Sequence, residues 1–534
     1  MSNKKTILHI IVGFLLYLIS FICLKNNNIG SYIFVGIGII ICGYYIFKNQ
    51  KQVLKHCKLG ICLAILACIL SPHHYWSENQ VQWLEIGKTL IVAVISFIYS
   101  ICFIDLLENN RESCKHGYNK WFSIIFYLLP LFVIGTEWIA SYPAKLSTDS
   151  FVQLEQIQQN QYSDVHPAAH TLFCKALMQI YNSPAIVIFT QILCLSLITG
   201  YSFQYFYKKG ISKNILLPIL IIWSCLGPIR IVTCYFWKDV FFAIALLLLT
   251  LEFVKIIDKK EKTNILDLIL AGIALIAITL FRHNGIIVFI FALIVFIYFA
   301  CKYHKKMLVP IAISLIGIVI VKTLVYSCFA VTPNNNGTKY ALPAKAIISV
   351  VYYDGNYTQE ELKKIEQLMS KEQIKLRYDA KIGQSLLWIK PSFGDSLEGK
   401  EKIIIELFIE LFPKNVGIMV KDIMSSTYLM TKFQYDDKNK FVNPNIVTSM
   451  PRLVGDNYWV NHNMPYMFLL IICMIILIKH KKFESLIPFV PMLANVLSIV
   501  ISNISYESRY AYPTIVCTAV LIVHTLYSIQ KEKE

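Results

Sequence analysis

Long runs of apolar residues, separated by short polar stretches, recur through most of this chain of 534 residues. A run of about 20 apolar residues can cross the hydrocarbon core of a bilayer as a helix. Only 16% of the residues are charged and 56% are hydrophobic, whereas soluble domains carry about 25% charge. The sequence therefore predicts an all-α polytopic membrane protein. Its fourteen expected spans lie near 6–24, 29–47, 59–76, 86–106, 121–141, 184–206, 213–230, 239–257, 264–281, 285–300, 307–326, 465–479, 484–502 and 512–528.

The basic residues of the chain fall in short clusters between the apolar runs, for example at 48–58, 207–213, 257–263 and 479–482. This pattern is typical of cytoplasmic loops that follow the positive-inside rule. It accounts for the net charge of +17 without a nucleic-acid partner. We expect a multi-pass protein of the cell (plasma) membrane with both termini in the cytoplasm. The alternation of sides allows one crossing between 142–165 and Lys208, so we expect 166–180 to form a juxtamembrane helix at the outer surface.

The chain divides into four expected parts. Residues 1–120 form an N-terminal four-helix membrane region, and 121–326 form a membrane core whose extracytoplasmic loop is 142–183. The stretch 327–464 is long enough for a small domain, which we expect to be mixed in structure, soluble and extracytoplasmic. Residues 465–534 form a C-terminal three-helix membrane region. The fifteen cysteines lie mostly inside apolar runs and show no CxxC spacing, which indicates packing residues.

Four polar clusters from distant parts of the chain are expected at the same outer face. Ionisable residues at the ends of spanning helices are costly unless they are paired or functional. A shared face therefore indicates a reaction site. The clusters are Asp149, Asp164 and His166 in 146–171; Lys238 and Asp239 in FWKDVFF; Arg282 and His283 in RHNG; and Glu507, Arg509 and Tyr510 in ESRYAYP.

Each cluster also has a structural explanation. Asp149 could favour a helix N-terminus through the helix dipole, and Lys238 could pair with Asp239. Arg282 and Arg509 could be interfacial anchors. His166 could mark a helix start before Pro167; with His170 it also has the i, i+4 spacing of zinc sites, but no HExxH motif accompanies it.

Several arginines and a lysine at an outer site suit a phosphate or pyrophosphate, because guanidinium groups bind these oxygens in a bidentate manner. A carboxylate beside them could act as a general base or bind a divalent metal. The chain contains neither GxxxxGK[ST] nor GxGxxG. The donor that fits is therefore a lipid phosphate held at the outer leaflet.

The set DSFVQ, HPAAHT, FWKDVFF, FRHNG and ESRYAYP resembles the GT-C superfamily of membrane glycosyltransferases, over roughly 121–330 and 465–528. Protein O-mannosyltransferases and aminoarabinose transferases carry an acidic pair early in the first outer loop and an [HK]-P-P-L element at its end. A group of uncharacterised bacterial GT-C-like proteins is more similar still. The acidic pair is Asp149–Ser150 here, and Ala168 follows the His166–Pro167 pair. These two departures leave the metal requirement and the acceptor class open.

The resemblance implies transfer of a sugar from a polyprenyl phosphate to a glycan, polymer, lipid or protein of the cell envelope. Asp149 would be the base or the ligand of a divalent metal, Mg²⁺ or Mn²⁺, and Asp164 and His166 would shape the acceptor side as further catalytic residues. The expected substrate-binding residues are Gln153, Lys238, Asp239, Arg282, His283, Glu507, Arg509 and Tyr510.

Two other functions fit a polytopic chain. A transporter or flippase of lipid-linked oligosaccharides would distribute charges through the midplane and carry two repeated halves, neither of which the sequence displays. A non-catalytic envelope sensor or scaffold would bind an external ligand through 327–464.

Overall fold

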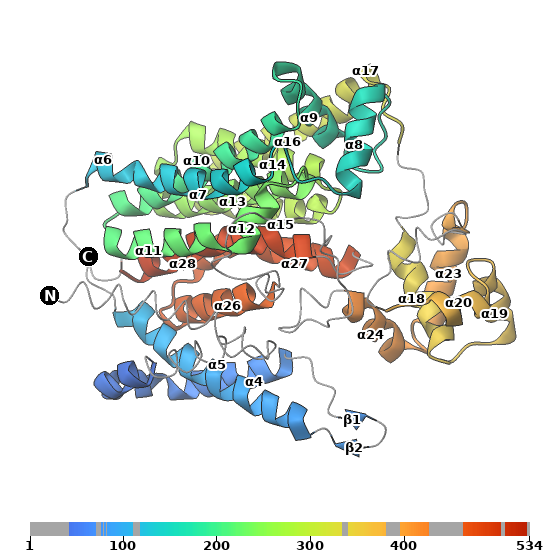
Figure 1. Ribbon diagram of the computed structural model, residues 1–534, viewed down its shortest axis with the longest axis horizontal. Coiled ribbons are helices and arrows are strands. Elements are labelled where there is room, and N and C mark those ends of the chain that lie inside the picture. The colour runs from blue at the N-terminus through green and yellow to red at the C-terminus, as the bar shows by residue number, and fades with distance from the viewer. Residues whose placement is uncertain are drawn as a thin grey trace.

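The computed structural model describes residues 42–70, 76–77, 80–81, 83–109, 118–333, 340–380, 396–426, 463–502 and 508–530. Nearly all of these residues are helical (Figure 1). The strands within these ranges are β1 (Trp76–Ser77) and β2 (Gln80–Val81), which pair antiparallel. The expected all-α class is confirmed for the described part of the chain. The expected span 6–24 and most of 29–47 lie outside it.

Eight helical stretches among the described residues are long and apolar enough to cross a membrane. They support a multi-pass membrane protein. The eight are α3 to α4 (Gln50–Ile69), α6 to α7 (Lys120–Ala140), α10 (Ala185–Lys208), α13 with η2 (Lys238–Lys262), α15 (Gly285–Lys302), η3 to α17 (Lys305–Cys328), η7 with α27 (Phe483–Ser502) and η8 with α28 (Arg509–Gln530). Within these stretches the separate helices are α3 (Gln50–Val53), η1 (Leu54–His56), α4 (Cys57–Leu70), α6 (Lys120–Ser123), α7 (Ile125–Ala140), α13 (Lys238–Lys259), η2 (Lys260–Lys262), η3 (Lys305–Leu308), α16 (Val309–Ile320), η4 (Val321–Val325), α17 (Tyr326–Cys328), η7 (Phe483–Phe489), α27 (Val490–Ser502), η8 (Ser508–Ala511) and α28 (Tyr512–Gln530).

A ninth span can be formed by α11 (Lys213–Cys225) and α12 (Gly227–Thr233), which meet at a bend of 56°. Leu226 between them is extended (ψ 133°) and precedes Gly227–Pro228, where the proline lacks the N–H that would continue the helix. Three further expected spans are covered by α5 (Trp83–Asn109), α14 (Ile265–Phe281) and α26 (Met464–Lys479). The total of fourteen spans stays a prediction.

The centre of the bundle is formed by α13 and α28, which pack on each other (Figure 1). In each, 94% of the most apolar window is buried, as expected for helices that are hydrophobic all round. The stretch from η3 to α17 is peripheral, with 17% buried, and exposes Leu315, Ile316 and Val319. The central position of α13 matters for the site because its first residues are Lys238 and Asp239.

Two short helices, α8 (Thr148–Gln159) and α9 (Ala168–Ile180), lie together with α17 at one end of the bundle (Figure 1). The expected helix over 166–180 is therefore present as α9. Its 13 residues are too few to cross a bilayer, and it packs on α8, α10 and α14.

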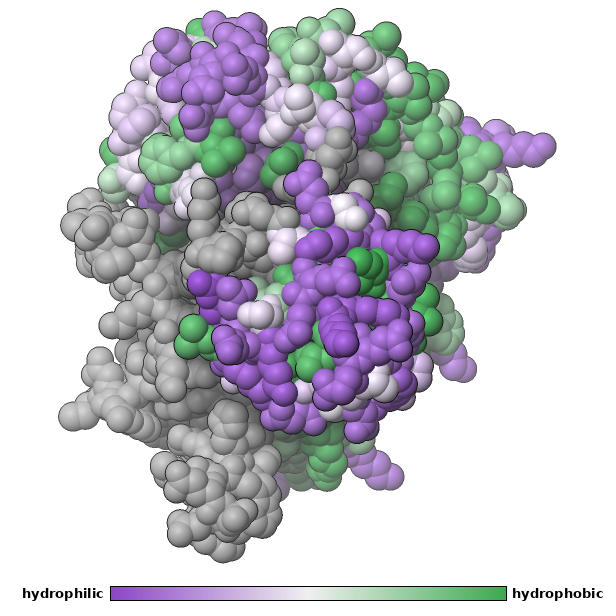
Figure 2. Space-filling model, turned by 90° about the vertical axis from the view of Figure 1, so that its right-hand side faces the viewer, coloured by the Kyte–Doolittle hydropathy of each residue, from purple (hydrophilic) through white to green (hydrophobic). Residues whose placement is uncertain are grey.

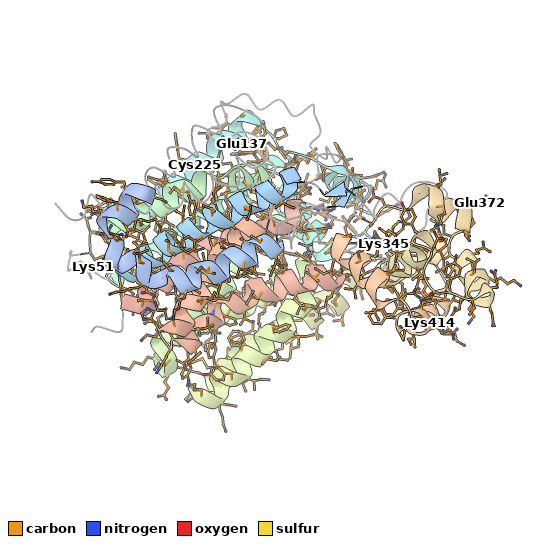
Figure 3. The ribbon with its side chains drawn as sticks, turned by 90° about the horizontal axis from the view of Figure 1, so that it is seen from below. Lys51, Glu137, Cys225, Lys345, Glu372 and Lys414 are labelled. Carbon is orange, nitrogen blue, oxygen red and sulfur yellow. The ribbon has the colours of Figure 1, made fainter. Side chains whose placement is uncertain are left out.

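A separate helical unit with its own apolar core lies beside the bundle (Figure 1). Figure 2 shows a largely hydrophilic surface on its side turned to the viewer. Inside it, Lys345 is buried and donates to Asp422 at 2.5 Å and to Ser426 at 3.0 Å (Figure 3). The described residues 340–380 and 396–426 contain no strand, which differs from the expected mixed domain over 327–464. The helices are α18 (Ala341–Tyr352), α19 (Gln359–Glu366), α20 (Lys371–Arg377), α23 (Glu401–Leu411) and α24 (Val416–Ser426).

Candidate active site

A buried triad of charges fixes the chain just before the expected site. Glu137, near the end of α7, pairs through one oxygen with Lys145 Nζ at 2.5 Å and through the other with Arg230 Nη2 at 2.9 Å. The loop residue Lys145 also forms a parallel β-bridge with Tyr235. The loop after α7 is thereby bound to the segment that leads into α13. Figure 3 labels Glu137 and Cys225 near each other on the bundle.

The start of α8 is bound to the start of α13. Trp237 Nε1 donates to Ser147 Oγ at 2.6 Å, and Ser150 Oγ donates to the Phe236 carbonyl at 2.8 Å. Asp149 lies in the first turn of α8, where the helix dipole favours a negative charge. These contacts place Asp149 beside Lys238.

Five charged side chains from four parts of the chain meet at this point. Asp149 Oδ2 accepts from Arg509 Nη1 at 2.6 Å and from Lys238 Nζ at 3.1 Å. Asp239 pairs with Arg282 at 2.7 Å, and its other oxygen lies 3.9 Å from Arg509. We call Asp149, Lys238, Asp239, Arg282 and Arg509 the ion-pair cluster. Its three cations and two carboxylates leave one positive charge in excess, which suits an anionic ligand.

Aromatic rings hold the two guanidinium groups. Arg282 lies 4.8 Å from the centre of the Tyr510 ring, and Arg509 lies 5.5 Å from the rings of both Tyr510 and Trp237. Trp237 is itself stacked on Tyr235, at 4.1 Å between centroids. Cation–π contacts of this kind stabilise a positive charge without neutralising it. The arginines therefore keep their planar faces fixed while their N–H groups remain directed at acidic groups.

The cluster changes the protonation of its neighbours. Burial alone would raise the pKa of Asp149, but the charges of Lys238 and Arg509 outweigh burial and hold that pKa well below its ordinary value. His166 Nδ1 lies 3.5 Å from Lys238 Nζ. Burial and the nearby Lys238 lower the pKa of His166 to about 4. At neutral pH, Asp149 is therefore ionised and His166 is neutral.

A pocket of about 490 Å³ opens around Asp164. Asp164 Oδ2 pairs with Lys322 at 2.8 Å, and Oδ1 accepts from Tyr326 Oη and from the Ala168 N–H, both at 2.9 Å. Burial alone would raise the pKa of Asp164. The hydrogen bonds from Lys322 and from the Ala168 N–H outweigh burial and hold that pKa below its ordinary value. Lys322 lies in η4, a π-helical turn, and such turns are frequent at functional sites. His283 also lines this pocket.

The RHNG turn owes its tightness to glycine. A Cβ at Gly285 would lie 1.9 Å from the Ile278 carbonyl oxygen, so no larger residue fits between α14 and α15. The Gly285 N–H closes the turn on the Arg282 carbonyl at 2.9 Å. The turn directs Arg282 to the ion-pair cluster, whereas His283 faces the Asp164 pocket.

Gln153 and His170 lie behind the cluster, in the core. The Gln153 amide contacts His170 Nδ1 and Thr171 Oγ1, both at 3.2 Å, and all three side chains are buried. His170 packs against Phe281 and Phe241. His166 faces Lys238, so the two histidines at i, i+4 have different partners. Gln153 therefore positions α8 on α9 in this structure.

The residues of the cluster fit a divalent metal poorly. Mg²⁺ and Mn²⁺ prefer several oxygen ligands with water completing the shell. The Oδ2 atom of Asp149 already accepts from two cations, and Asp239 is held by Arg282. In the described part of the chain no three His, Cys, Asp or Glu residues gather in a metal-binding arrangement.

The structure brings together most of the expected residues. Asp149, His166, Lys238, Asp239, Arg282, Arg509 and Tyr510 form one connected set, with Asp164 and His283 beside it, whereas Glu507 lies outside the described residues. Sequence reasoning missed Glu137, Lys322 and Tyr326. Glu137 and Lys322 each interrupt an apolar run, which is a signal that could have found them.

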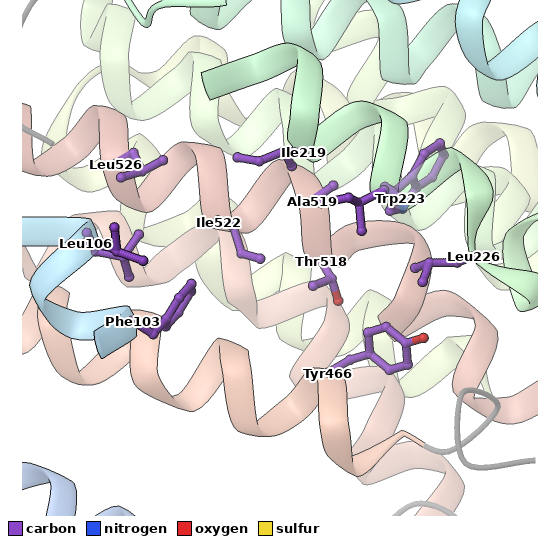
Figure 4. A pocket seen from close by; sticks show the side chains of 12 residues that line it. Phe103, Leu106, Ile219, Trp223, Leu226, Tyr466, Thr518, Ala519, Ile522 and Leu526 are labelled. Carbon is purple, nitrogen blue, oxygen red and sulfur yellow. The ribbon is translucent and has the colours of Figure 1, made fainter. Parts of the chain in front are cut away.

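A second cavity of about 30 Å³ lies deeper in the bundle, between α5, α11, α26 and α28 (Figure 4). Its lining is apolar apart from the Thr518 and Tyr466 hydroxyls and the Trp223 indole, as Figure 4 shows. It is about the volume of one water molecule and carries no charged group. The chemistry of the site does not extend into it.

Comparisons of the chain with protein-family models, with curated proteins and with solved structures return no match.

Proposed function

We propose that this protein is an extracytoplasmic glycosyltransferase that moves a sugar from a polyprenyl phosphate to an acceptor of the cell envelope. The observation that carries the proposal is the ion-pair cluster, in which Lys238, Arg282 and Arg509 surround Asp149 and Asp239 at the start of α13. Cations held by aromatic rings suit a phosphate, and a carboxylate within their reach suits an acceptor hydroxyl.

In the proposed reaction each group of the cluster has one role. The acceptor hydroxyl loses its proton to Asp149 as its oxygen forms a bond to the anomeric carbon of the sugar. The bond from that carbon to the phosphate oxygen breaks, and the electron pair leaves with the polyprenyl phosphate. Lys238 and Arg509 stabilise the charge that develops on the leaving phosphate, as preorganised cations do in other transfer reactions.

Donor binding would also activate the base. Asp149 is a weak base while Lys238 and Arg509 are bound to it. A lipid phosphate that enters the cluster competes for the same cations. As these hydrogen bonds move from the carboxylate to the phosphate, the pKa of Asp149 rises towards the range of a useful base. The donor therefore prepares the enzyme for the acceptor, which disfavours abstraction of protons before the donor is bound.

The Asp164 pocket is the proposed acceptor side. It is lined by Asp164, His283, Lys322 and Tyr326, which offer both donors and acceptors to hydroxyl groups. His166, two residues after Asp164, is neutral at physiological pH and lies 3.5 Å from Lys238 Nζ through its Nδ1 atom. It can accept a hydrogen bond from the incoming hydroxyl or from Lys238.

Orientation is part of the proposal. Lys255, Lys259, Lys302 and Lys306 lie at the end of the bundle away from the cluster, because α13 and α15 both run from the site to that end. The positive-inside rule assigns that end to the cytoplasm. The cluster would then face the outside. Fourteen spans would cross the plasma membrane of a bacterial cell, and both termini would lie in the cytoplasm.

The test compares the envelope glycans of cells that contain the wild-type protein, no protein, or Asp149→Asn, by mass spectrometry. We expect one sugar modification to disappear without the protein and to remain absent with Asp149→Asn, at equal protein levels. An unchanged glycan profile in cells without the protein would contradict the proposal.

A further inference from the structure

A second polar pocket, of about 810 Å³, lies at the far end of α13 from the ion-pair cluster. It is lined by the ends of α13 and α28, by α15 and by the turn from α26 into η7. The 22 residues of α13 span roughly 33 Å at about 1.5 Å per residue, close to the thickness of a bilayer core. The pocket and the cluster therefore lie at opposite membrane interfaces. We call it the basic pocket.

Four lysines line the basic pocket: Lys260, Lys302, Lys481 and Lys482. Its two acids already have partners, since Glu484 pairs with Lys302 and Asp258 pairs with Lys209. Among the described residues, no carboxylate forms an ion pair with the other three lysines. The pocket therefore carries uncompensated positive charge.

Two of these lysines occupy backbone positions that usually favour glycine or asparagine. Lys481 has φ 55° just after the end of α26, and Lys260 has φ 51° just after the end of α13. A left-handed conformation is uncommon for such a residue. Both side chains line the basic pocket.

His524 supplies an independent observation. This side chain of α28 lines the basic pocket and is only 2% exposed. Its Nε2 atom contacts the Ser485 carbonyl at 3.0 Å, so this nitrogen carries the proton and Nδ1 is an acceptor. Nδ1 has no hydrogen-bond partner among the described residues. A buried acceptor of this kind calls for a donor, which a headgroup hydroxyl can provide.

The side of the pocket is apolar and open to the membrane. Ile294 of α15 and Phe483 of η7 both line it and are 59% and 61% exposed. A free anion would gain nothing from these side chains, whereas the first methylenes of an acyl chain would cover them. Lysines above an apolar side wall match the division of a phospholipid into headgroup and chain.

We propose that the basic pocket binds an anionic phospholipid whose headgroup carries hydroxyl groups, such as phosphatidylglycerol. Lys260, Lys481 and Lys482 bind the phosphate, a headgroup hydroxyl donates to His524 Nδ1, and the acyl chains lie along Ile294 and Phe483. Basic pockets between membrane helices are known to select such lipids. This inference does not depend on the reaction at the ion-pair cluster.

The test is native mass spectrometry of the purified full chain titrated with phosphatidylglycerol or phosphatidylcholine. Lys481→Gln/Lys482→Gln removes two charges from the pocket. Lys262→Gln/Lys305→Gln removes two exposed lysines of the same end that do not line it, and serves as the matched control. We expect the pocket variant to bind phosphatidylglycerol about 10- to 30-fold more weakly, the control to bind as the wild type does, and phosphatidylcholine to bind weakly throughout.

Equal losses in the pocket variant and the control would overturn the proposal, because only general surface charge would then be involved. Stabilisation of the wild type by inorganic phosphate, with no preference for phosphatidylglycerol, would overturn the lipid as the source of the phosphate. Should the double variant fail to fold, Lys260→Gln tests the same site with one change, for which we expect a loss of about three- to fivefold.

Discussion

Arg509 Nη1 donates a hydrogen bond to Asp149 Oδ2 at 2.6 Å, although 360 positions separate the two residues in the chain. Lys238 reaches the same oxygen at 3.1 Å, so Asp149 joins α8, α13 and η8 at one point. This charged hydrogen bond links α8 to the last part of the described chain.

The Asp149–Arg509 pair should be measurable as a coupling between the two residues. We expect Asp149→Asn and Arg509→Gln each to lower thermal stability, and the double variant to lose less than the sum, with a coupling of about 1–3 kcal/mol. The measurement is the unfolding midpoint of the purified protein for all four members of the cycle. Additive losses would mean that the two side chains do not interact.

Glu137 should be needed to position the site even though its ion-pair partners, Lys145 and Arg230, lie outside the ion-pair cluster. In Glu137→Gln, Lys145 and Arg230 would stay buried without their partner, at a cost of about 3–5 kcal/mol in stability. We also expect a lower turnover rate, because the loop before Asp149 would lose its anchor. Glu155→Gln is the matched control, since Glu155 is exposed and accepts only from Gln159 among the described residues. An unfolding midpoint of Glu137→Gln as high as that of the control would contradict the role of the triad.

His166 should make stability depend on pH in the mildly acidic range. Its pKa is about 4 in the folded protein and about 6.5 when unfolded. Between these values the unfolded chain binds the extra proton, so stability falls as the pH is lowered from about 6.5 to 4, by about 1–3 kcal/mol. His166→Asn should flatten that part of a plot of unfolding midpoint against pH. His170 has a pKa of about 3 and titrates over the same range, so a residual slope is expected in the variant. A slope identical to that of the wild type would show that His166 is not held neutral.

Two native cysteines report the orientation. Cys328 and Cys301 are both exposed. Cys328 is the last residue of the stretch from η3 to α17, which returns to the site end, whereas Cys301 lies at the other end of α15 beside Lys302. A membrane-impermeant maleimide applied to intact cells should modify Cys328 and spare Cys301, as read by peptide mass spectrometry, with Cys328→Ser as the control. Modification of Cys301 with protection of Cys328 would reverse the proposed sidedness.

The convergence of the charged residues could be predicted because each one lies at the end of an apolar run, where a charge without a partner is costly. Which charged residue pairs with which could not be predicted from the sequence. Lys238 and Asp239 are adjacent, and the sequence alone allows them to pair, but neighbours on a helix point in different directions. Lys238 therefore turns to Asp149, and Asp239 turns to Arg282.

The helical unit beside the bundle shows a different limit. Its charged run TQEELKKIEQLMSKEQIKLRYDAKI (358–382) predicts a helix, and two helices, α19 and α20, are found there. The burial of Lys345 against Asp422 depends on α18 and α24, which are 77 positions apart at this contact and whose packing no local pattern encodes. The small Asp164 pocket was missed for the same reason, because Lys322 and Tyr326 reach it from a helix far along the chain.

The central claim is that Asp149 takes the proton of the acceptor while Arg509 and Lys238 hold the donor phosphate. It is tested most directly with purified protein in nanodiscs, loaded with polyprenyl-phosphate sugars and supplied with the acceptor found in cells. We expect Asp149→Asn to bind the lipid donor at least as tightly as the wild type and to lose transfer by at least about 100-fold, in line with removal of a general base. Full turnover in Asp149→Asn, and likewise in Arg282→Ala and Arg509→Ala, would contradict the assignment of this site.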